Sequence, residues 1–302
     1  MALALASDVK VSPEIRELGL EPYVLELEVN GLTIVPPEVH GVTEDQIDRM
    51  VEILLARAEQ IVGCPFDLEV GPTAEIQFPQ TEQTLSRLAG DEPGQPSQFL
   101  IQQLSRLDRA FRDLAVNPAA VTLMRHMIGP KAARFSSHNS FVKWQGDFGY
   151  GPHLGLHADQ TAVPLPWGRV AYTSNTNWCL TDYTLDGGAL AYVPGSHRNG
   201  VRPVQPEATR KAVPAEGPKG SLIVFHGATW HGAFPRKTPG MRLSIANYYR
   251  HMMVTSQEDI QGTFPRELAD DCDNPELFKE LAGFGDAFPY AAQTQPLPHA
   301  VG

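Results

Sequence analysis

The chain has 302 residues, 42% of them hydrophobic and 20% charged, and its net charge at neutral pH is −11. Such usage is ordinary for a globular protein, and the acidic excess argues against nucleic acid or an anionic membrane as partner. No apolar run reaches the ~18 residues of a membrane-spanning helix, and the three cysteines have no C-x-x-C spacing. We therefore expect a cytoplasmic protein that is either a monomer or a homodimer.

The first part of the chain predicts a short strand and then a helix. Residues 32–35 are rich in aliphatic and β-branched side chains and are followed by two prolines, which favours a strand. A helix is predicted over residues 43–61, because Thr43 can cap its first turn and Gln46 completes a capping box. Apolar residues then recur on one face of this helix, so we expect that face to cover a sheet.

A loop and further helices are predicted next. Residues 77–98 are rich in proline, glycine, glutamine and threonine, which indicates a long surface loop. From Phe99 to Leu114 apolar residues recur at helical spacing, and Asn117 begins a second helix that ends at Gly129.

The remainder of the chain indicates a sheet structure. Between residues 131 and 253, short alternating segments are separated by glycine and proline, as in an antiparallel sandwich. Helices followed by strands give an α+β class. We expect one catalytic domain over 1–302, in which 1–130 is a helical support region, 131–253 is the core, and 254–302 is a tail packed outside.

His157-Ala-Asp159 and the distant His231 are the candidate metal ligands. On an extended segment, residues two apart project to the same side, so His157 and Asp159 can reach one metal. His231 follows an apolar strand and a glycine-rich exit. Two imidazoles and one carboxylate leave open positions on iron(II), as non-haem oxygenases need. The alternative is a hydrogen-bonded polar pair at a strand edge.

Arg242 lies on a second strand-like segment after His231. Alternation places Arg242, Ser244 and Ala246 on one face, and the turn 235–240 is expected to fold this strand back beside His231. The planar guanidinium group can bind a carboxylate at two points. Alternatively, Arg242 is a surface residue of the strand.

Several blocks between residues 135 and 251 resemble the phytanoyl-CoA dioxygenase family of iron(II)/2-oxoglutarate oxygenases. Besides the candidate ligands and Arg242, the resembling blocks are Asn177-Trp178-Cys-Leu-Thr-Asp-Tyr-Thr, Asp186-Gly-Gly-Ala-Leu and Val193-Pro-Gly-Ser-His. The resemblance implies a double-stranded β-helix, that is, a cupin-like jelly-roll core with flanking N-terminal helices. It also implies Fe(II), 2-oxoglutarate and O₂ as cofactor and cosubstrates.

Carried over by matching positions, the resemblance implies that His157, Asp159 and His231 bind iron. It implies that Arg242 binds the distal carboxylate of 2-oxoglutarate, and that Lys143, on the strand before the H-x-D motif, also reaches this cosubstrate.

Ser244 and Trp178 are further candidates for binding the cosubstrate. Ser244 shares the face of Arg242, and Trp178 belongs to one of the resembling blocks. The sequence departs from the family at Ala233, where members often carry a hydroxyl residue, and in the segment 234–236 that follows. These departures affect the cosubstrate contacts and leave the ligand triad unchanged.

Four aromatic residues flank the H-x-D motif: Trp144, Phe148, Tyr150 and Trp167. Aromatic side chains at the mouth of a pocket provide apolar contact for a substrate. The alternative is that they fill the core.

These features predict a dioxygenase that oxidises a largely apolar small molecule by hydroxylation, desaturation or related C–H chemistry, and releases succinate and CO₂. One alternative is a catalytically silent cupin that binds a metal or 2-oxoglutarate. Another is a zinc hydrolase with the same three ligands, which would need a general base.

Overall fold

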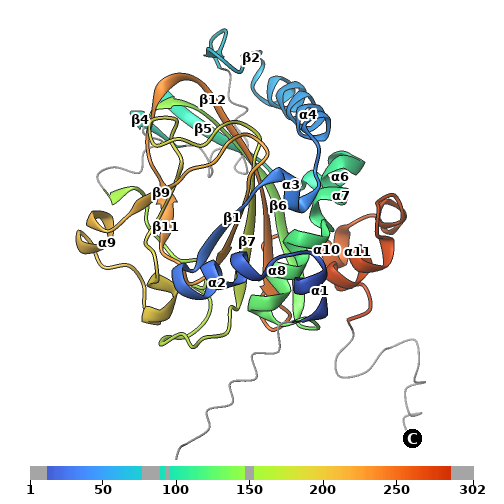
Figure 1. Cartoon of the computed structure of the whole chain (residues 1–302). Coiled ribbons are helices and arrows are strands. Elements are labelled where there is room, and N and C mark those ends of the chain that lie inside the picture. Colours follow the sequence, from blue (N-terminus) through green and yellow to red (C-terminus); the bar gives the residue numbers. More distant parts are fainter. Residues whose placement is uncertain (1–11, 77–88, 93–94, 147–152, 287–302) are drawn as a thin grey trace, which may run out of the picture.

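The computed structural model describes residues 12–76, 89–92, 95–146 and 153–286. These residues form antiparallel sheets flanked by helices (Figure 1), in agreement with the predicted α+β class. The central sheet has seven strands in the order β1-β10-β7-β12-β6-β5-β4. Their bounds are β1 (Leu32–Val35), β10 (Leu222–His226), β7 (Thr173–Cys179), β12 (Arg236–His251), β6 (Ala133–Gly146), β5 (Gln95–Ile101) and β4 (Ala89–Glu92).

A smaller sheet lies on one side of the central sheet. It has the order β11-β8-β9, with β11 at His231–Ala233, β8 at Leu190–Tyr192 and β9 at Val213–Ala215. A two-stranded hairpin, β2 (Phe66–Asp67) with β3 (Gly71–Pro72), is separate. Because β11 and β12 belong to different sheets, the expectation that Arg242 would lie on a strand beside His231 is wrong. The chain instead crosses from the small sheet to the large one between them.

Helices cover the other face of the central sheet (Figure 1). α4 (Glu44–Val62) begins at Thr43 with the predicted capping box, and α8 (Pro118–Ile128) begins at Asn117, whose side chain accepts from two backbone N–H groups. Apolar side chains of α4 and α8 pack on alternate residues of the strands beneath, including Val142, Trp178 and Ile245. The shorter helices are α1 (Pro13–Glu17), α2 (Glu21–Asn30), α3 (Pro37–His40), α6 (Leu104–Leu107) and α7 (Arg109–Ala115), with the 3₁₀ helix η2 (Ser196–Asn199) after β8. Helix α9 (Glu207–Arg210) lies instead beside the small sheet (Figure 1), where Ala208 belongs to an apolar cluster with Ala191 and Val193.

Two expectations for the middle of the chain are wrong. The predicted loop 77–98 contains β4 and the start of β5, and the predicted helix from Phe99 to Leu114 begins as the end of β5. Gln98 to Ile101 pair with Lys143 to Ser140 of β6, so long-range strand pairing outweighs the local apolar spacing. Residues 77–88 and 93–94 lie outside the described part.

The C-terminal segment packs mainly on the outside of the sheet. α10 (Ile260–Thr263), the 3₁₀ helix η3 (Arg266–Asp270) and α11 (Pro275–Leu281) form a second apolar cluster with β6 and α8. Phe278 of α11 contacts Phe135 of β6, with ring centroids 5.0 Å apart. Residues between β12 and α10 run along the edge of β6, where Ser256 and Gln257 bond to Ser136.

None of the helices in the described ranges combines the length and the apolar character that a membrane crossing needs. Cys64, Cys179 and Cys272 are buried free thiols.

Candidate metal and cosubstrate site

A cavity of about 440 Å³ lies between the two sheets. Its lining comes from β5, β6, β7, β10 and β12 of the large sheet, from β8 and β11 of the small sheet, from the segment 155–159, and from Gln257 after β12. His157, Asp159, His231, Lys143 and Arg242 all line it. The structure therefore brings the predicted metal ligands and the two predicted cations into one space.

Backbone pairing places the two histidines side by side. His157 and His231 exchange two backbone hydrogen bonds of 2.9 Å each, as an isolated antiparallel bridge. The segment before His157 passes so close to Gly232 that a Cβ there would lie 2.1 Å from the carbonyl oxygen of Leu154. Only glycine fits at position 232, so this residue allows the approach that sets the distance between the histidines.

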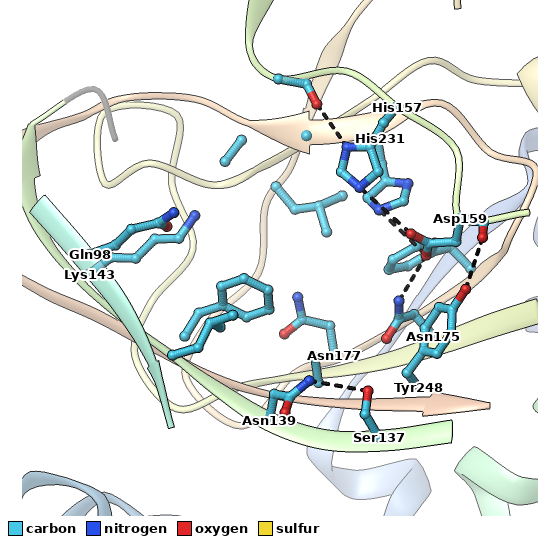
Figure 2. Close-up of a pocket in the computed structure, with 18 of the residues that line it drawn as sticks. Gln98, Ser137, Asn139, Lys143, His157, Asp159, Asn175, Asn177, His231 and Tyr248 are labelled. Atoms are coloured by element: carbon cyan, nitrogen blue, oxygen red, sulfur yellow. Dashed lines mark hydrogen bonds and ion pairs between the residues drawn. The ribbon is translucent and has the colours of Figure 1, made fainter. Parts of the chain in front are cut away.

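The three candidate ligands converge on one point (Figure 2). The Nε2 atoms of His157 and His231 each lie 3.6 Å from an oxygen of Asp159. The Nδ1 atoms contact the backbone carbonyl oxygens of Gly155 (2.8 Å) and Thr229 (2.9 Å). The carbonyl contacts therefore assign the N–H to Nδ1 in each ring, and both Nε2 atoms face the carboxylate.

This donor set fits a divalent metal. Metal-bound histidines commonly donate their second N–H to a carbonyl oxygen, as both rings do here. Burial lowers the pKa of His231 to about 4, opposed by Asp159 and reinforced by His157, so the imidazole is neutral and able to bind a metal at neutral pH. Two imidazoles and one carboxylate suit iron(II), and zinc also accepts such ligands.

Asp159 is held by contacts on both its backbone and its side chain. Its N–H donates to the carbonyl of Gly227 (2.7 Å), and its carbonyl accepts from the hydroxyl of Tyr248 (3.0 Å). Asn175 donates from Nδ2 to Oδ2 of the carboxylate at 3.0 Å (Figure 2). The side chain of His157 is 55% exposed and that of Asp159 13%, so the site opens to solvent on the side of His157.

Lys143 and Arg242 form a basic region in the same cavity. They lie directly opposite each other on β6 and β12, and Gln98 of β5 is opposite Lys143. Both cations are almost completely buried, with 2% and 3% exposure. Burial and the charge of Arg242 hold the pKa of Lys143 well below its usual value. An anionic group bound here would relieve this repulsion.

Arg242 is fixed in place by its neighbours. Its Nη1 donates to the carbonyl of Gly188, and its guanidinium carbon lies 4.8 Å from the ring centroid of Tyr183. A surface role for Arg242 is therefore wrong, because the side chain is buried against the small sheet and its connections.

The other two candidates for cosubstrate contact are placed differently. Ser244 is buried on the face of Arg242, between it and Ala246, but it is not among the residues that line the cavity. Trp178 projects to the opposite face of β7, where it packs among the helices and meets His40 edge-on, with centroids 4.9 Å apart. Strand alternation puts its neighbour Asn177 at the cavity instead. The placement of Trp178 therefore disagrees with cosubstrate binding.

The aromatic residues predicted to contact substrate are also away from the cavity lining where they are described. Trp144 packs in the core beneath the helices, with Phe66 at 5.8 Å between ring centroids. Trp167 lies in a separate apolar cluster, and its indole N–H donates to the carbonyl of Val163. For both residues the alternative of core filling agrees with the structure. Phe148 and Tyr150 lie outside the described residues.

Sequence reasoning missed a set of polar residues that line the cavity. They are uncharged and carry amide or hydroxyl groups: Gln98, Ser137, Asn139, Asn175, Asn177, Tyr248 and Gln257. A signal existed on β6, since Ser137 and Asn139 share the alternation of Lys143. No local signal marked Gln257, because its contact depends on how the chain after β12 turns back along β6.

Comparison with known proteins relates this chain to dioxygenases. The family profile "Phytanoyl-CoA dioxygenase (PhyH)" matches residues 41–244, which include the three candidate ligands and Arg242. "Dioxygenase af480" of Aspergillus fumigatus is 30% identical over 190 residues, which are 62% of this chain and 59% of that protein. The chain thus matches less than two thirds of this relative. "Dioxygenase lolE1" of Epichloe uncinata is 24% identical over 247 residues, 78% of this chain and 84% of that protein.

Solved structures share the fold at low sequence identity. The non-heme alpha ketoglutarate dependent epimerase SnoN from nogalamycin biosynthesis has a TM-score of 0.52 and 17% identity, over 78% of this chain and 84% of its own. HygX from Streptomyces hygroscopicus, solved with nickel and 2-oxoglutarate, has a TM-score of 0.54 and 13% identity, over 78% and 88%. Because the family profile covers more than half of the sequence, this chain belongs to the phytanoyl-CoA dioxygenase family.

Proposed function

We propose that the protein is an Fe(II)- and 2-oxoglutarate-dependent dioxygenase that oxidises a C–H bond of a small organic molecule. One observation carries the proposal: a convergent His-Asp-His set and a buried pair of cations share one cavity. We further propose that the two facing sheets are the halves of a cupin-like jelly roll, open at the end where His157 is exposed.

Each group has a distinct part in this proposal. Nε2 of His157, Nε2 of His231 and a carboxylate oxygen of Asp159 would hold the iron, which with 2-oxoglutarate and O₂ supplies an oxidant for C–H bonds. Arg242 would bind the distal carboxylate of 2-oxoglutarate at two points, and Lys143 would add a second positive group. Both cations are buried, so these contacts would be made away from bulk water, which strengthens them.

The proposal extends to reaction type only in general terms. Relatives are named dioxygenases, whereas structures of the same fold are described as an epimerase and a carbocyclase. We therefore propose hydroxylation, desaturation or related C–H chemistry.

The test is reconstitution without oxygen. Purified protein receives Fe(II) and 2-oxoglutarate, oxygen is admitted, and oxygen uptake and succinate are measured together. We expect one succinate to form for each O₂ consumed, and no turnover when Zn(II) replaces iron. The variant His231→Ala should lose most of the oxygen uptake and succinate formation. Binding of 2-oxoglutarate without succinate formation would indicate the silent cupin, and activity on esters or amides with zinc alone would indicate the hydrolase.

A further inference from the structure

One wall of the cavity has no part in binding iron or 2-oxoglutarate as proposed above. It consists of Ser137 and Asn139 on β6 and Gln257 from the segment after β12. In Figure 2, Ser137 and Asn139 lie at the bottom of the cavity, away from both Lys143 and the metal ligands.

Hydrogen bonds connect this wall to a carboxyl group behind it. The hydroxyl of Ser137 lies 2.6 Å from Oε1 of Gln257 and 3.1 Å from the side-chain amide of Asn139. With its nitrogen toward Glu258, the Asn139 amide donates to Oε1 of Glu258 (3.2 Å), and its oxygen accepts from Ser137. Glu258 Oε1 also accepts from the backbone N–H groups of Gln103 (3.0 Å) and His138 (3.3 Å). Glu258, Asn139, Ser137 and Gln257 thus form one chain of hydrogen bonds, which we call the polar relay.

The relay presents only neutral groups to the cavity. Among the described lining residues, the formally charged side chains are Lys143, Arg242 and Asp159, which the proposed iron and cosubstrate would occupy. Hydroxyl and amide groups can both donate and accept hydrogen bonds. A hydrocarbon against this wall would displace water without replacing its hydrogen bonds, and a carboxylate would find no cation there.

We propose that the polar relay recognises a neutral hydroxyl or carbonyl group of the substrate, with Gln257 and Asn139 as contact residues and Glu258 as the positioning residue. This inference rests on the proposed function for the reaction, but it concerns binding. It changes the expectation of a largely apolar substrate to a neutral molecule that carries oxygen.

Glu258 sets the orientation of the Asn139 amide. Burial raises the pKa of Glu258 to about 7, while the backbone N–H groups of Gln103 and His138 and the charge of Arg106 on α6 act against this rise. Oε1 of Glu258 accepts from Asn139 Nδ2 as well as from the two backbone N–H groups, and Asn139 Nδ2 also donates to the carbonyl oxygen of His138 (3.3 Å). Asn139 Oδ1 therefore faces Ser137, whose hydroxyl can donate to Asn139 or to Gln257 Oε1. When Ser137 donates to Asn139, Gln257 Oε1 is available to accept from an alcohol.

The experiment uses the full chain loaded with Ni(II) and 2-oxoglutarate. In this form the protein can bind ligands without turnover. A library of size-matched fragments in three groups, neutral alcohols and ketones, hydrocarbons, and carboxylates, is screened by thermal shift, and the hits are titrated by calorimetry. We expect the hits to come from the neutral oxygen-bearing group. Asn139→Leu and Gln257→Leu should lower the affinity for these hits at least tenfold. Ser256→Ala, on the same segment but outside the cavity lining, should leave the affinity unchanged.

Glu258→Leu tests the positioning role separately, with Glu258→Gln as the conservative control. Glu258→Leu removes the acceptor that orients Asn139 and should weaken binding of the neutral hits several-fold, whereas Glu258→Gln, which keeps an oxygen at this position, should retain it. Hits spread equally over the three groups, no neutral hits, or hits unaffected by Gln257→Leu would overturn the inference. Binding of 2-oxoglutarate to the Ni(II) protein is measured in each variant, so failure of the proposed cosubstrate site is distinguished from failure of the relay.

Discussion

The two faces of the central sheet differ sharply although they share the same strands. Val142, Trp144, Trp178, Leu243 and Ile245 face the helices and are buried in one apolar cluster. The residues between them face the cavity and are mostly polar: Asn139, Lys143, Asn175, Asn177, Arg242 and Tyr248. Neighbours in sequence therefore serve different purposes, as with Asn177 and Trp178, or Arg242 and Leu243.

This difference shows how the fold tolerates a costly site. Buried cations and amides reduce stability unless they are paired, whereas buried aromatic and aliphatic side chains add to it. Placing both sets on the same hydrogen-bonded strands lets the helix-covered face stabilise the backbone that positions the site. A shift of one residue in strand register would exchange the two sets, so the pairing also specifies the site.

Removing a metal ligand on the cavity side should have the largest effect on function. Asp159→Ala is expected to abolish oxygen uptake and to lose Ni(II) binding by calorimetry, because a site with two ligands loses both affinity and geometry. The circular dichroism spectrum should be unchanged, since Asp159 lies away from the helix-covered face. Oxygen consumption near the parent rate would reject the assigned triad.

A change on the helix-covered face should reduce stability and leave the binding site intact. Trp178→Ala is expected to lower the free energy of unfolding by about 3–5 kcal/mol, through the cavity that the lost indole leaves. The affinity of folded protein for 2-oxoglutarate should change little. Asn177→Ala is the matched control on the cavity face, and urea unfolding of both variants compares the faces. If Trp178→Ala left stability intact but weakened cosubstrate binding, the separation of the faces would be wrong.

Arg242 tests charge and geometry within the cavity. Arg242→Ala should raise the Michaelis constant for 2-oxoglutarate about ten- to a hundredfold, equivalent to about 1.5–3 kcal/mol for a lost charged hydrogen bond. Arg242→Lys should fall between, since it keeps the charge and loses the two-point contact. Iron affinity should stay constant. Lys237→Ala, an exposed cation of β12, is the control, and an equal effect there would contradict the assignment.

Lowering the pH should reduce the free energy of unfolding through His138, which lies on the helix-covered side of β6. Burial lowers the pKa of His138 to about 3, whereas the unfolded residue titrates near 6.5. Below pH 6.5 the unfolded chain gains a proton that the native protein does not, so this group's stabilisation is lost at about 1.4 kcal/mol per pH unit as pH falls toward 3. His138→Gln should reduce that slope in urea unfolding between pH 6.5 and 5.5.

Glu258 should change stability with pH in the opposite direction and therefore serves as a control. Its raised pKa means that the native protein retains a proton that the unfolded chain loses between pH 4.5 and about 7, so this contribution to stability falls as pH rises. Glu258→Gln should therefore steepen the acid loss of stability. An unchanged slope in both variants would contradict these pKa shifts.

Local rules in the sequence were enough for several features. The capping box at Thr43 and the helix start at Asn117 depend on residues a few positions apart, and both are confirmed. The spacing of His157 and Asp159 and the face of Arg242 follow from strand alternation, which is also local. The family resemblance was also visible in the sequence, because the H-x-D motif, His231 and Arg242 all lie within the residues that the family profile matches.

Tertiary structure decided what depends on pairing between distant segments. The strand at Gln98 exists because β6 pairs with it, against a local pattern that indicated a loop and a helix. Trp178 faces the helices because the register of β7 with β10 and β12 assigns the cavity to Asn177. Asn175 beside Asp159 and Gln257 beside Ser137 are contacts across 16 and 120 positions. Side-chain alternation has a period but no absolute phase, and only the packed sheet supplies that phase.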